Sequence, residues 1–483
     1  MAAAPEVLPI AIIGAGPGGL CTAIRLLEAG LRDFRIFERA SGVGGTWYNN
    51  IYPGLECDVR SHLYSFSFAP KKDWSQPYPA QPEILAYLQE IAKRYEILPH
   101  VSFDTEVRSA RWDVESSTWE LVTSRETLRA RVLVSAMGMF NVLRWPELPG
   151  LDSLQGTLFH SARWRSDCDM SGERVAVIGS AASAVQLAPE IAPVVEQLLL
   201  FQRSASWVLP KANTPFTPSE IERFVRDPDA ARLERAKIEA EIDAGLTFSD
   251  PEMRRGAEGA GLQSLAAVRD PDVRARLTPT VPWGCHRPLV TNKFYPMFNR
   301  PNVELITEPI ERITERGIAT RDGREHAVDT IVCATGFDVG RFLSAIEVTG
   351  RGGLRLDDVW RDGAMAYRGI AVPGFPNAFM LYGPNTNNGS ILTMIEAQAD
   401  YIVRQIRRMR DEGLCWVDVR PEPMKRWVER VDRELAEVEV WQVHCHNYYR
   451  GPSGRIVTQW PKPMAEFARR LAEPDLEAYE VSA

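Results

Sequence analysis

Short apolar runs alternate with stretches of helical spacing at the start of the chain. Residues 8–13 and 34–37 are runs of apolar, mostly β-branched or aromatic residues, whereas leucine, alanine and isoleucine recur over residues 20–27 at the spacing of one helical face. Continuous apolar runs are typical of strands buried on both faces of a parallel sheet. The pattern therefore predicts a strand, a helix and a second strand over residues 8–37.

The turn between the first strand and the helix is rich in glycine, with the sequence Gly14-Ala-Gly16-Pro-Gly-Gly19. Gly14 allows the tight turn, Gly16 lets a pyrophosphate approach the helix N-terminus, and Gly19 lets helix and strand pack closely. Glu38 follows Gly14 by 24 residues and ends the second strand, where a carboxylate holds a ribose hydroxyl pair. The unit predicts a dinucleotide site that is compatible with FAD or NAD.

A second strand, turn and helix pattern begins at residue 174 and is followed by a strand over residues 197–201. Arg203 lies 24 residues after Gly179, where the first unit has Glu38. An acid suits a free ribose and an arginine suits a 2′-phosphate, so the first site predicts FAD and the second NADPH. The predicted NADPH contacts are Gly179, Ser180, Ala181, Ser183, Ala184, Arg203 and Ser204.

Ala181 departs from the fingerprint, because it stands where the second glycine is expected. Its methyl group is expected to hold the pyrophosphate slightly further away, whereas Ala184 is an accepted variant at the third position. The alternative is a scaffold that has lost its nucleotide, but this alternative leaves Arg203 unexplained.

The predicted fold class is α/β, with two Rossmann-like dinucleotide-binding domains and a helical insertion in the second. The insertion is a charged, helix-favouring stretch, either a solvated cap or a wall of the substrate pocket. Strand-like runs that end in glycine turns at Gly138 and Gly336 are the expected hinges. The predicted boundaries are 1–145 and 340–483 for the two parts of the FAD domain, 151–212 and 281–332 for the two parts of the NADPH domain, and 213–280 for the insertion.

Composition restricts the ligand class. The 483 residues are 45% apolar and 25% charged, and the net charge is −8 without a basic cluster, so we expect a globular protein with a small-molecule substrate and neither a nucleic-acid nor a membrane partner. Residues 7–24 carry no charge, but their glycines and prolines make a poor membrane span. The first six residues lack the cationic region of a secretory signal. We expect a cytoplasmic monomer or weak homo-oligomer.

Seven cysteines are scattered along the chain without a C-x-x-C pair. We therefore expect no disulfide framework and no dithiol or zinc motif, with Cys57 and Cys285 as buried thiols. His444 and His446 have no spacing of further ligands that would complete a metal site.

Two longer motifs carry a family resemblance. Residues 44–58, Gly44-Gly45-Thr46-Trp47 through Tyr52-Pro53-Gly54 to Asp58, resemble the flavin-side signature of the type I Baeyer–Villiger monooxygenases. Residues 154–164 are similar to the family's second signature, although Leu154, Ser161 and Arg165 replace its usual residues. Trp164 favours this branch over the related flavin-containing monooxygenases, which typically have a smaller aromatic residue there.

The resemblance implies an enzyme that binds FAD and NADPH, forms a peroxide at the flavin C4a carbon from O2, and converts a ketone into an ester or lactone. It implies that Arg287 is the catalytic arginine and that Asp58 orients it. An arginine suits this chemistry because a guanidinium stays charged and offers planar donors to developing negative charge. The implied FAD contacts are Gly14, Gly16, Gly19, Glu38, Gly45, Thr46, Trp47, Asp58, Tyr64, Val107 and Met139, and His286, Arg287 and Tyr448 join the NADPH set.

Two further residues depart from the family pattern. His286 replaces a lysine that helps to hold the 2′-phosphate, so we expect a weaker and more pH-sensitive NADPH preference. Tyr448 replaces a tryptophan. The alternatives are N- or S-oxygenation of amines or sulfides, and an NADPH oxidase or redox protein without oxygen transfer. His160 and Trp164 are expected to pack at the domain hinge.

Overall fold

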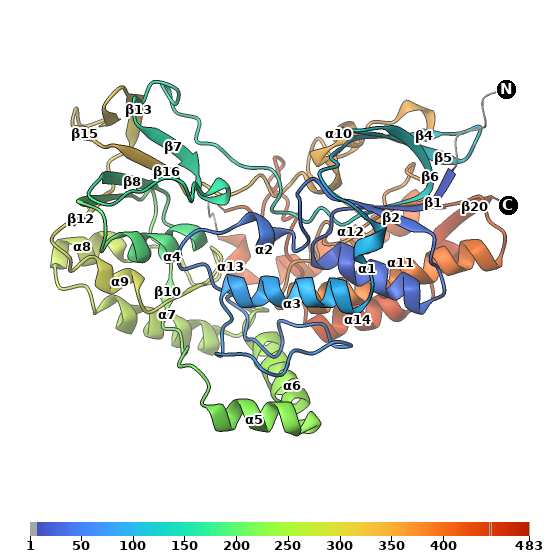
Figure 1. The fold of residues 1–483 in the computed structure, drawn as a ribbon, viewed down its shortest axis with the longest axis horizontal. Coiled ribbons are helices and arrows are strands. Elements are labelled where there is room, and N and C mark those ends of the chain that lie inside the picture. Colours follow the sequence, from blue (N-terminus) through green and yellow to red (C-terminus); the bar gives the residue numbers. More distant parts are fainter. Residues whose placement is uncertain (1–6, 444, 446, 483) are drawn as a thin grey trace.

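The computed structural model describes residues 7–443, 445 and 447–482, and it places them in two sheet-centred units that lie side by side (Figure 1). In the first unit β1 (Val7–Ile13) is parallel to β2 (Phe34–Phe37) and to β6 (Thr127–Ser135). Helix α1 (Pro17–Glu28) follows the glycine turn and buries Leu20 and Ile24. The two apolar runs of the sequence therefore form neighbouring interior strands of the sheet.

The C-terminal part of the chain returns to this first sheet. Its strand order is β17-β4-β5-β6-β1-β2-β3, and β18 (Ala378–Met380) pairs with β6. β17 (Glu347–Thr349) pairs with β4 (Val107–Asp113), and the long helix α11 (Ile391–Asp411) packs against α1. The other elements of this unit are α2 (Thr46–Asn49), α3 (Gln81–Arg94), β3 (Val101–Ser102), β5 (Thr118–Thr123), α10 (Leu356–Val359), β19 (Trp416–Val419), α12 (Pro421–Ala436), α13 (Glu439–Gln442), α14 (Met464–Ala472) and β20 (Tyr479–Ser482).

The second unit has a five-stranded parallel sheet in the order β12-β9-β8-β16-β7. Its strands are β7 (Thr157–His160), β8 (Arg174–Ile178), β9 (Gln197–Phe201), β12 (Val303–Ile306) and β16 (Thr330–Cys333). The accompanying elements are α4 (Ala182–Ile191), the short parallel pair β10 (Val208–Leu209) and β11 (Leu289–Val290), α9 (Phe294–Met297), and the small sheet of β13 (Ile310–Thr314), β14 (Gly317–Thr320) and β15 (Glu325–Ala327). The exact domain boundaries stay a prediction.

The two connections between the units pair with each other. The Arg144 N–H donates to the Gly336 carbonyl at 2.9 Å, and the Asp338 N–H donates to the Val142 carbonyl at 2.9 Å. The His160 ring Nε2 lies 3.0 Å from the same Gly336 carbonyl. His160 is thus a buried packing residue of the hinge, whereas Trp164 packs on Phe159 within the second unit.

The insertion consists of α5 (Pro218–Arg226), α6 (Pro228–Gly245), α7 (Pro251–Leu265) and α8 (Pro271–Leu277). Each helix starts directly after a Thr or Asp whose side chain accepts a first-turn N–H, a strong helix-start signal. Helix α6 packs on the first unit: Ile238 is 1% exposed there, and Arg235 donates to the Ser65 carbonyl at 2.7 Å. The insertion therefore bridges both units and is more than a solvated cap. Over the described residues no helix is long and apolar enough to cross a membrane.

Candidate active site

Two glycine turns of the first unit lie against each other at the N-terminus of α1. Gly14 has φ +100°, and a Cβ on it would come within 2.8 Å of the Ala136 carbonyl oxygen. The Gly44 N–H donates to the Ala15 carbonyl at 3.0 Å, and a Cβ on Gly45 would lie 2.8 Å from the Gly16 Cα. The turns form a cradle of bare backbone that side chains would fill. This cradle fits a pyrophosphate group.

Glu38 reaches this cradle from the end of β2. Its carboxylate accepts the Ala15 N–H at 2.7 Å and the Ala40 N–H at 2.8 Å, and the side chain is buried. The carboxylate is thus fixed beside the glycine turn, in the place where a ribose hydroxyl pair is held. Gly19 lies on α1 with no room for a Cβ against the Gly14 carbonyl, so its role is the close packing of helix and strand.

The remaining predicted FAD residues lie at two places in the first unit. Thr46 is exposed at the first position of α2, and the Trp47 Nε1–H donates to the Tyr64 hydroxyl at 2.9 Å. Trp47 and Tyr64 are both buried. Val107 and Met139 are buried in the core cluster on the other face of the sheet. The structure therefore brings Thr46, Trp47 and Tyr64 together beside Gly45, but it places Val107 and Met139 in a different core cluster.

The second glycine turn reproduces the backbone geometry of the first. Gly179 has φ +116°, and Ala181 caps α4 with φ −95° and ψ −160°, close to the −77° and −173° of Gly16. An alanine adopts these angles without strain, so the departure at Ala181 is conformationally permitted. Neither Gly16 nor Ala181 carries a side-chain acceptor, so the first-turn N–H groups of α1 and α4 are left for an anion. The helices of the insertion, in contrast, are capped by Thr or Asp.

Arg203 and Ser204 follow β9 and are exposed beside this second turn. The Ser180 hydroxyl donates to the Ser204 carbonyl at 3.3 Å, which ties the two segments together. Ala184 is buried against the sheet and Ser183 is half-buried. The guanidinium thus stands at the strand end where a 2′-phosphate is held.

The catalytic pair of the sequence prediction meets at the junction of the two units. The Arg287 Nε–H and Nη2–H donate to Oδ2 of Asp58 at 3.0 and 2.5 Å, and each side chain is 33% exposed. Burial acts to raise the pKa of Asp58, but the Arg287 charge and hydrogen bond, together with Lys211, outweigh it and hold the pKa below its usual 3.8. Asp58, in turn, raises the pKa of Arg287 well above its ordinary value. Both groups are therefore charged at neutral pH.

Two tyrosines flank this pair. The Arg287 Nη1–H donates to the Tyr448 hydroxyl at 3.5 Å. Tyr382 is buried nearby and donates its hydroxyl to Asn387 Oδ1 at 2.6 Å, and burial raises its pKa so that it stays protonated. Tyr448 therefore faces the arginine itself, and Tyr382 adds a second hydroxyl that the sequence interpretation missed.

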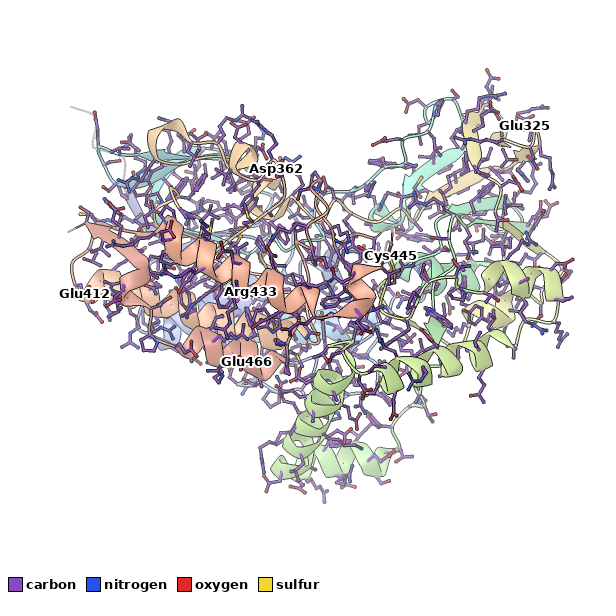
Figure 2. All side chains as sticks on the ribbon, turned by 180° about the vertical axis from the view of Figure 1, so that it is seen from behind. Glu325, Asp362, Glu412, Arg433, Cys445 and Glu466 are labelled. Atoms are coloured by element: carbon purple, nitrogen blue, oxygen red, sulfur yellow. A yellow bond between two sulfur atoms is a disulfide. The ribbon has the colours of Figure 1, made fainter. Side chains whose placement is uncertain are left out.

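The loop before Arg287 is fastened to the C-terminal segment. Cys285 is fully buried and forms a disulfide with Cys445, 160 positions away, with a Cα–Cα distance of 6.1 Å. Asn447 donates to the Cys285 carbonyl at 2.7 Å, and His286 is half-buried between Cys285 and Arg287. The expectation of a free thiol at Cys285 is wrong, because sequence spacing carries no information about a pairing made by folding. Figure 2 shows Cys445 near the middle of the molecule, where the C-terminal helices meet the second unit.

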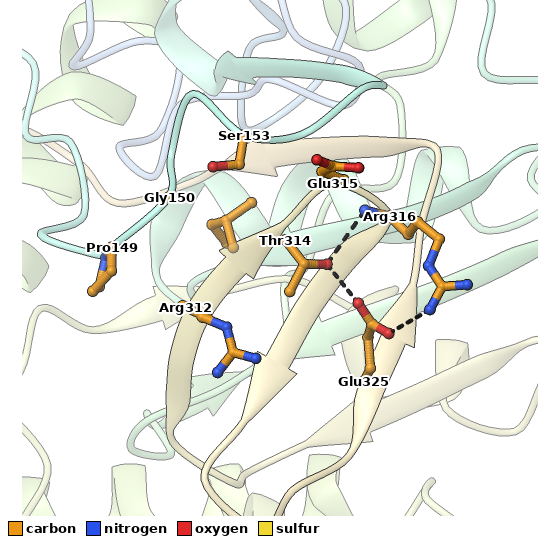
Figure 3. A pocket seen from close by; sticks show the side chains of 9 residues that line it. Pro149, Gly150, Ser153, Arg312, Thr314, Glu315, Arg316 and Glu325 are labelled. Carbon is orange, nitrogen blue, oxygen red and sulfur yellow. Dashed lines mark hydrogen bonds and ion pairs between the residues drawn. The ribbon is translucent and has the colours of Figure 1, made fainter.

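A surface hollow of about 520 Å³ lies elsewhere, on the small sheet of the second unit (Figure 3). Its wall includes Glu325, which accepts from the Thr314 hydroxyl at 2.7 Å and from Arg316 at 2.9 Å. Its lining contains none of the predicted site residues. This hollow is therefore separate from the Arg287 site.

In the part of the chain that the structure describes, no group of three or more His, Cys, Asp or Glu side chains is arranged to hold a metal ion. His444 and His446 lie outside the described residues.

Comparison with known proteins identifies relatives along the whole chain. The model of the flavin-binding monooxygenase-like family matches residues 8–226. A Baeyer–Villiger monooxygenase of Streptomyces coelicolor is 40% identical over 99% of this chain and 93% of its own, and one of Pseudomonas aeruginosa is 38% identical over 99% and 92%. Among solved structures, a closed cyclohexanone monooxygenase has a TM-score of 0.90 at 30% identity, and a steroid monooxygenase bound to NADP has 0.88 at 32%; each comparison covers 99% of this chain and 100% of the other.

Fold, site and relatives together define a flavin-dependent monooxygenase with two dinucleotide-binding units. Within this class the chain belongs to the Baeyer–Villiger monooxygenases, which oxidise ketones with O2, FAD and NADPH. The predictions of fold class, enzyme class and cofactors are thereby confirmed.

Proposed function

We propose that this Baeyer–Villiger monooxygenase converts a small ketone, O2, NADPH and a proton into an ester or lactone, NADP⁺ and water, and that Arg287 is its essential catalytic residue. The observation that carries this proposal is the Arg287–Asp58 ion pair at the junction of the two dinucleotide units. FAD, when bound, takes a hydride from NADPH and activates O2. The protein must bind both nucleotides and stabilise negative charge where oxygen is transferred.

Arg287 supplies that stabilisation. Its guanidinium keeps its proton at any working pH, so it offers a permanent positive charge to the carbonyl oxygen of the ketone as that oxygen becomes negative. Asp58 accepts two of its N–H groups and fixes the plane of the fork. Tyr448 lies on the remaining side, where its hydroxyl limits how the arginine can turn.

The nucleotide assignments follow from the two cradles. We assign FAD to the first unit, through Gly14, Gly16, Gly19, Glu38, Gly45, Thr46, Trp47, Asp58, Tyr64, Val107 and Met139. We assign NADPH to the second unit, through Gly179, Ser180, Ala181, Ser183, Ala184, Arg203, Ser204, His286, Arg287 and Tyr448. The uncapped N-termini of α1 and α4 support both assignments.

The environment of the enzyme is part of the same proposal. We assign it to the cytoplasm as a monomer or weak homo-oligomer. The absence of a C-x-x-C pair and the five free cysteines support this assignment. The Cys285–Cys445 disulfide is the exception, since disulfides are rare in a reducing compartment.

The test is an incubation of purified enzyme with NADPH, ¹⁸O-labelled O2, a panel of ketones and a thioether, with products identified by mass. We expect labelled ester or lactone from a ketone. The Arg287→Ala variant should retain FAD, but its rate of ester formation should be lower by a factor of about 10²–10³. Arg300 is an exposed arginine of the same unit, and Arg300→Ala should leave the rate unchanged. A fully active Arg287→Ala variant, or sulfoxide as the sole oxygenated product, contradicts the proposal.

A further inference from the structure

A second cation of the NADPH-binding unit reaches the loop that carries Asp58. The Lys211 Nζ–H donates to Glu56 Oε2 at 2.7 Å and to the Cys57 carbonyl at 3.1 Å. Its side chain is only 4% exposed, whereas that of Glu56 is 29% exposed. A lysine is almost never this deeply buried unless it is paired, and here both of its partners directly precede Asp58.

The backbone of Lys211 is held rigidly. Strands β10 and β11 run parallel, with Val208 opposite Leu289. Beyond the strands the Asn292 side chain accepts the Lys211 N–H at 2.8 Å and donates to the Lys211 carbonyl at 2.6 Å. Lys211 therefore follows one strand of a two-stranded ribbon, and Arg287 precedes the other.

This ribbon holds a three-residue segment of the FAD-binding unit at two points. Lys211 holds Glu56 and Cys57, and Arg287 holds Asp58. Gln186 on α4 supports the same segment by donating to the Glu56 carbonyl at 2.9 Å. Because charge pairs fix both ends of the segment, a shift at Glu56 moves Asp58 relative to Arg287.

We propose that Lys211 is a positioning residue for oxygen transfer, which holds the Glu56–Asp58 segment against the second unit so that the Asp58 carboxylate meets Arg287 in the correct orientation. The inference rests on the proposed role of Arg287. The Lys211 ammonium contacts the Glu56 carboxylate and the Cys57 carbonyl, so it acts on Arg287 through the segment that carries Asp58. Its positive charge also acts on Asp58 in the same direction as that of Arg287.

The test compares Lys211→Met with Lys211→Arg in the FAD-loaded enzyme. In Lys211→Met we expect normal FAD content and an unchanged KM for NADPH, but a rate of ester formation lower by roughly 10- to 100-fold, since small misplacements of reacting groups cost up to about 10². NADPH oxidation should continue, but O2 should be reduced to hydrogen peroxide, and less ester should form per NADPH. Lys211→Arg keeps the positive charge and should therefore retain most of the ester yield per NADPH. If Lys211 only filled space, the yield would not depend on this charge.

Two further variants keep the test decisive. Lys211→Met with Glu56→Gln leaves no unpaired charge, so it should fold even if the single variant does not, and it should remain low in ester yield. Lys462→Met removes a lysine that pairs with Glu437 in the C-terminal part of the first unit, and it should behave as the wild type. Wild-type ester yield in Lys211→Met or in the double variant overturns the inference. If Arg287→Ala still abolishes ester formation in that case, the proposed function survives and only the role of Lys211 fails.

Discussion

Arg287 directs two of its N–H groups to a single oxygen, Oδ2, of Asp58, and the two residues come from different units of the fold. Asp58 lies on the loop after α2, and Arg287 lies just before β11. The pair therefore forms only where the units touch. The orientation of the Arg287 guanidinium therefore depends on how the two units are docked.

Removal of the carboxylate should separate ester formation from NADPH oxidation. In Asp58→Ala the guanidinium loses both hydrogen bonds that fix its plane, so we expect the rate of ester formation to fall by about 10- to 100-fold while NADPH oxidation persists. The measurement is ester and hydrogen peroxide formed per NADPH consumed. Asp58→Asn keeps one oxygen acceptor, so its ester yield per NADPH should lie between that of the wild type and that of Asp58→Ala.

A matched control is available in the second unit. Asp329 also pairs with an arginine, Arg174, at 2.8 Å, but it lies away from the Asp58 loop. Asp329→Ala should leave the ester yield per NADPH unchanged. If Asp58→Ala kept the same yield as this control, Asp58 would have no orienting role.

The nucleotide sites show how much local sequence can predict. The strands, the turns at Gly14 and Gly179, Glu38 and Arg203 follow from short-range patterns, and the structure has each of them in the expected element. The glycine turns are predictable because the local backbone requires glycine there, either for a positive φ or for a close approach of two backbone segments. The helices of the insertion also begin at local Thr-Pro or Asp-Pro signals.

The contacts between the units could not be predicted in this way. Lys211 and Glu56 are 155 positions apart, and Cys285 and Cys445 are 160 apart. No periodicity or spacing links such residues, because their contact depends on how two separately built sheets dock. The Arg287–Asp58 pair was predicted only from the resemblance to a family, and not from any local pattern in this chain.

The Cys285–Cys445 link should stabilise the loop before Arg287. Closing so long a loop reduces the conformational entropy of the unfolded chain, so its loss should lower the free energy of unfolding by about 2–4 kcal/mol. Thermal unfolding of the wild type with and without a thiol reductant measures this effect. Cys445→Ser should unfold at the lower temperature under both conditions, and a wild type that shows no response to reductant would contradict a stabilising role.

Asp418 gives the stability of the first unit a defined pH dependence. It is 5% exposed on β19, and burial raises its pKa from 3.8 to about 6, although the Gly374 N–H and Arg351 oppose this shift. The folded protein thus binds this proton more tightly than the unfolded chain, so the stabilisation is complete below 3.8 and is lost as the pH rises through about 6. The difference corresponds to about 3 kcal/mol.

Asp418→Asn mimics the protonated group and should remove this pH dependence. We expect the unfolding temperature of the variant to change less than that of the wild type between roughly pH 4 and pH 7. Its stability relative to the wild type should therefore be greatest at neutral pH. Parallel pH profiles for the two proteins would show that Asp418 titrates normally.

Arg203 should decide the choice between NADPH and NADH. Its guanidinium is exposed beside the second glycine turn, where a charge-assisted hydrogen bond to a 2′-phosphate contributes about 1.5–3 kcal/mol. Arg203→Ala should therefore lower kcat/KM for NADPH by about 10- to 100-fold and leave kcat/KM for NADH unchanged, because NADH has no phosphate at that position. Steady-state kinetics with both nucleotides on one ketone measures the ratio. An equal loss with both nucleotides would mean that Arg203 supports the turn itself, and His286 would then be the remaining candidate for the 2′-phosphate.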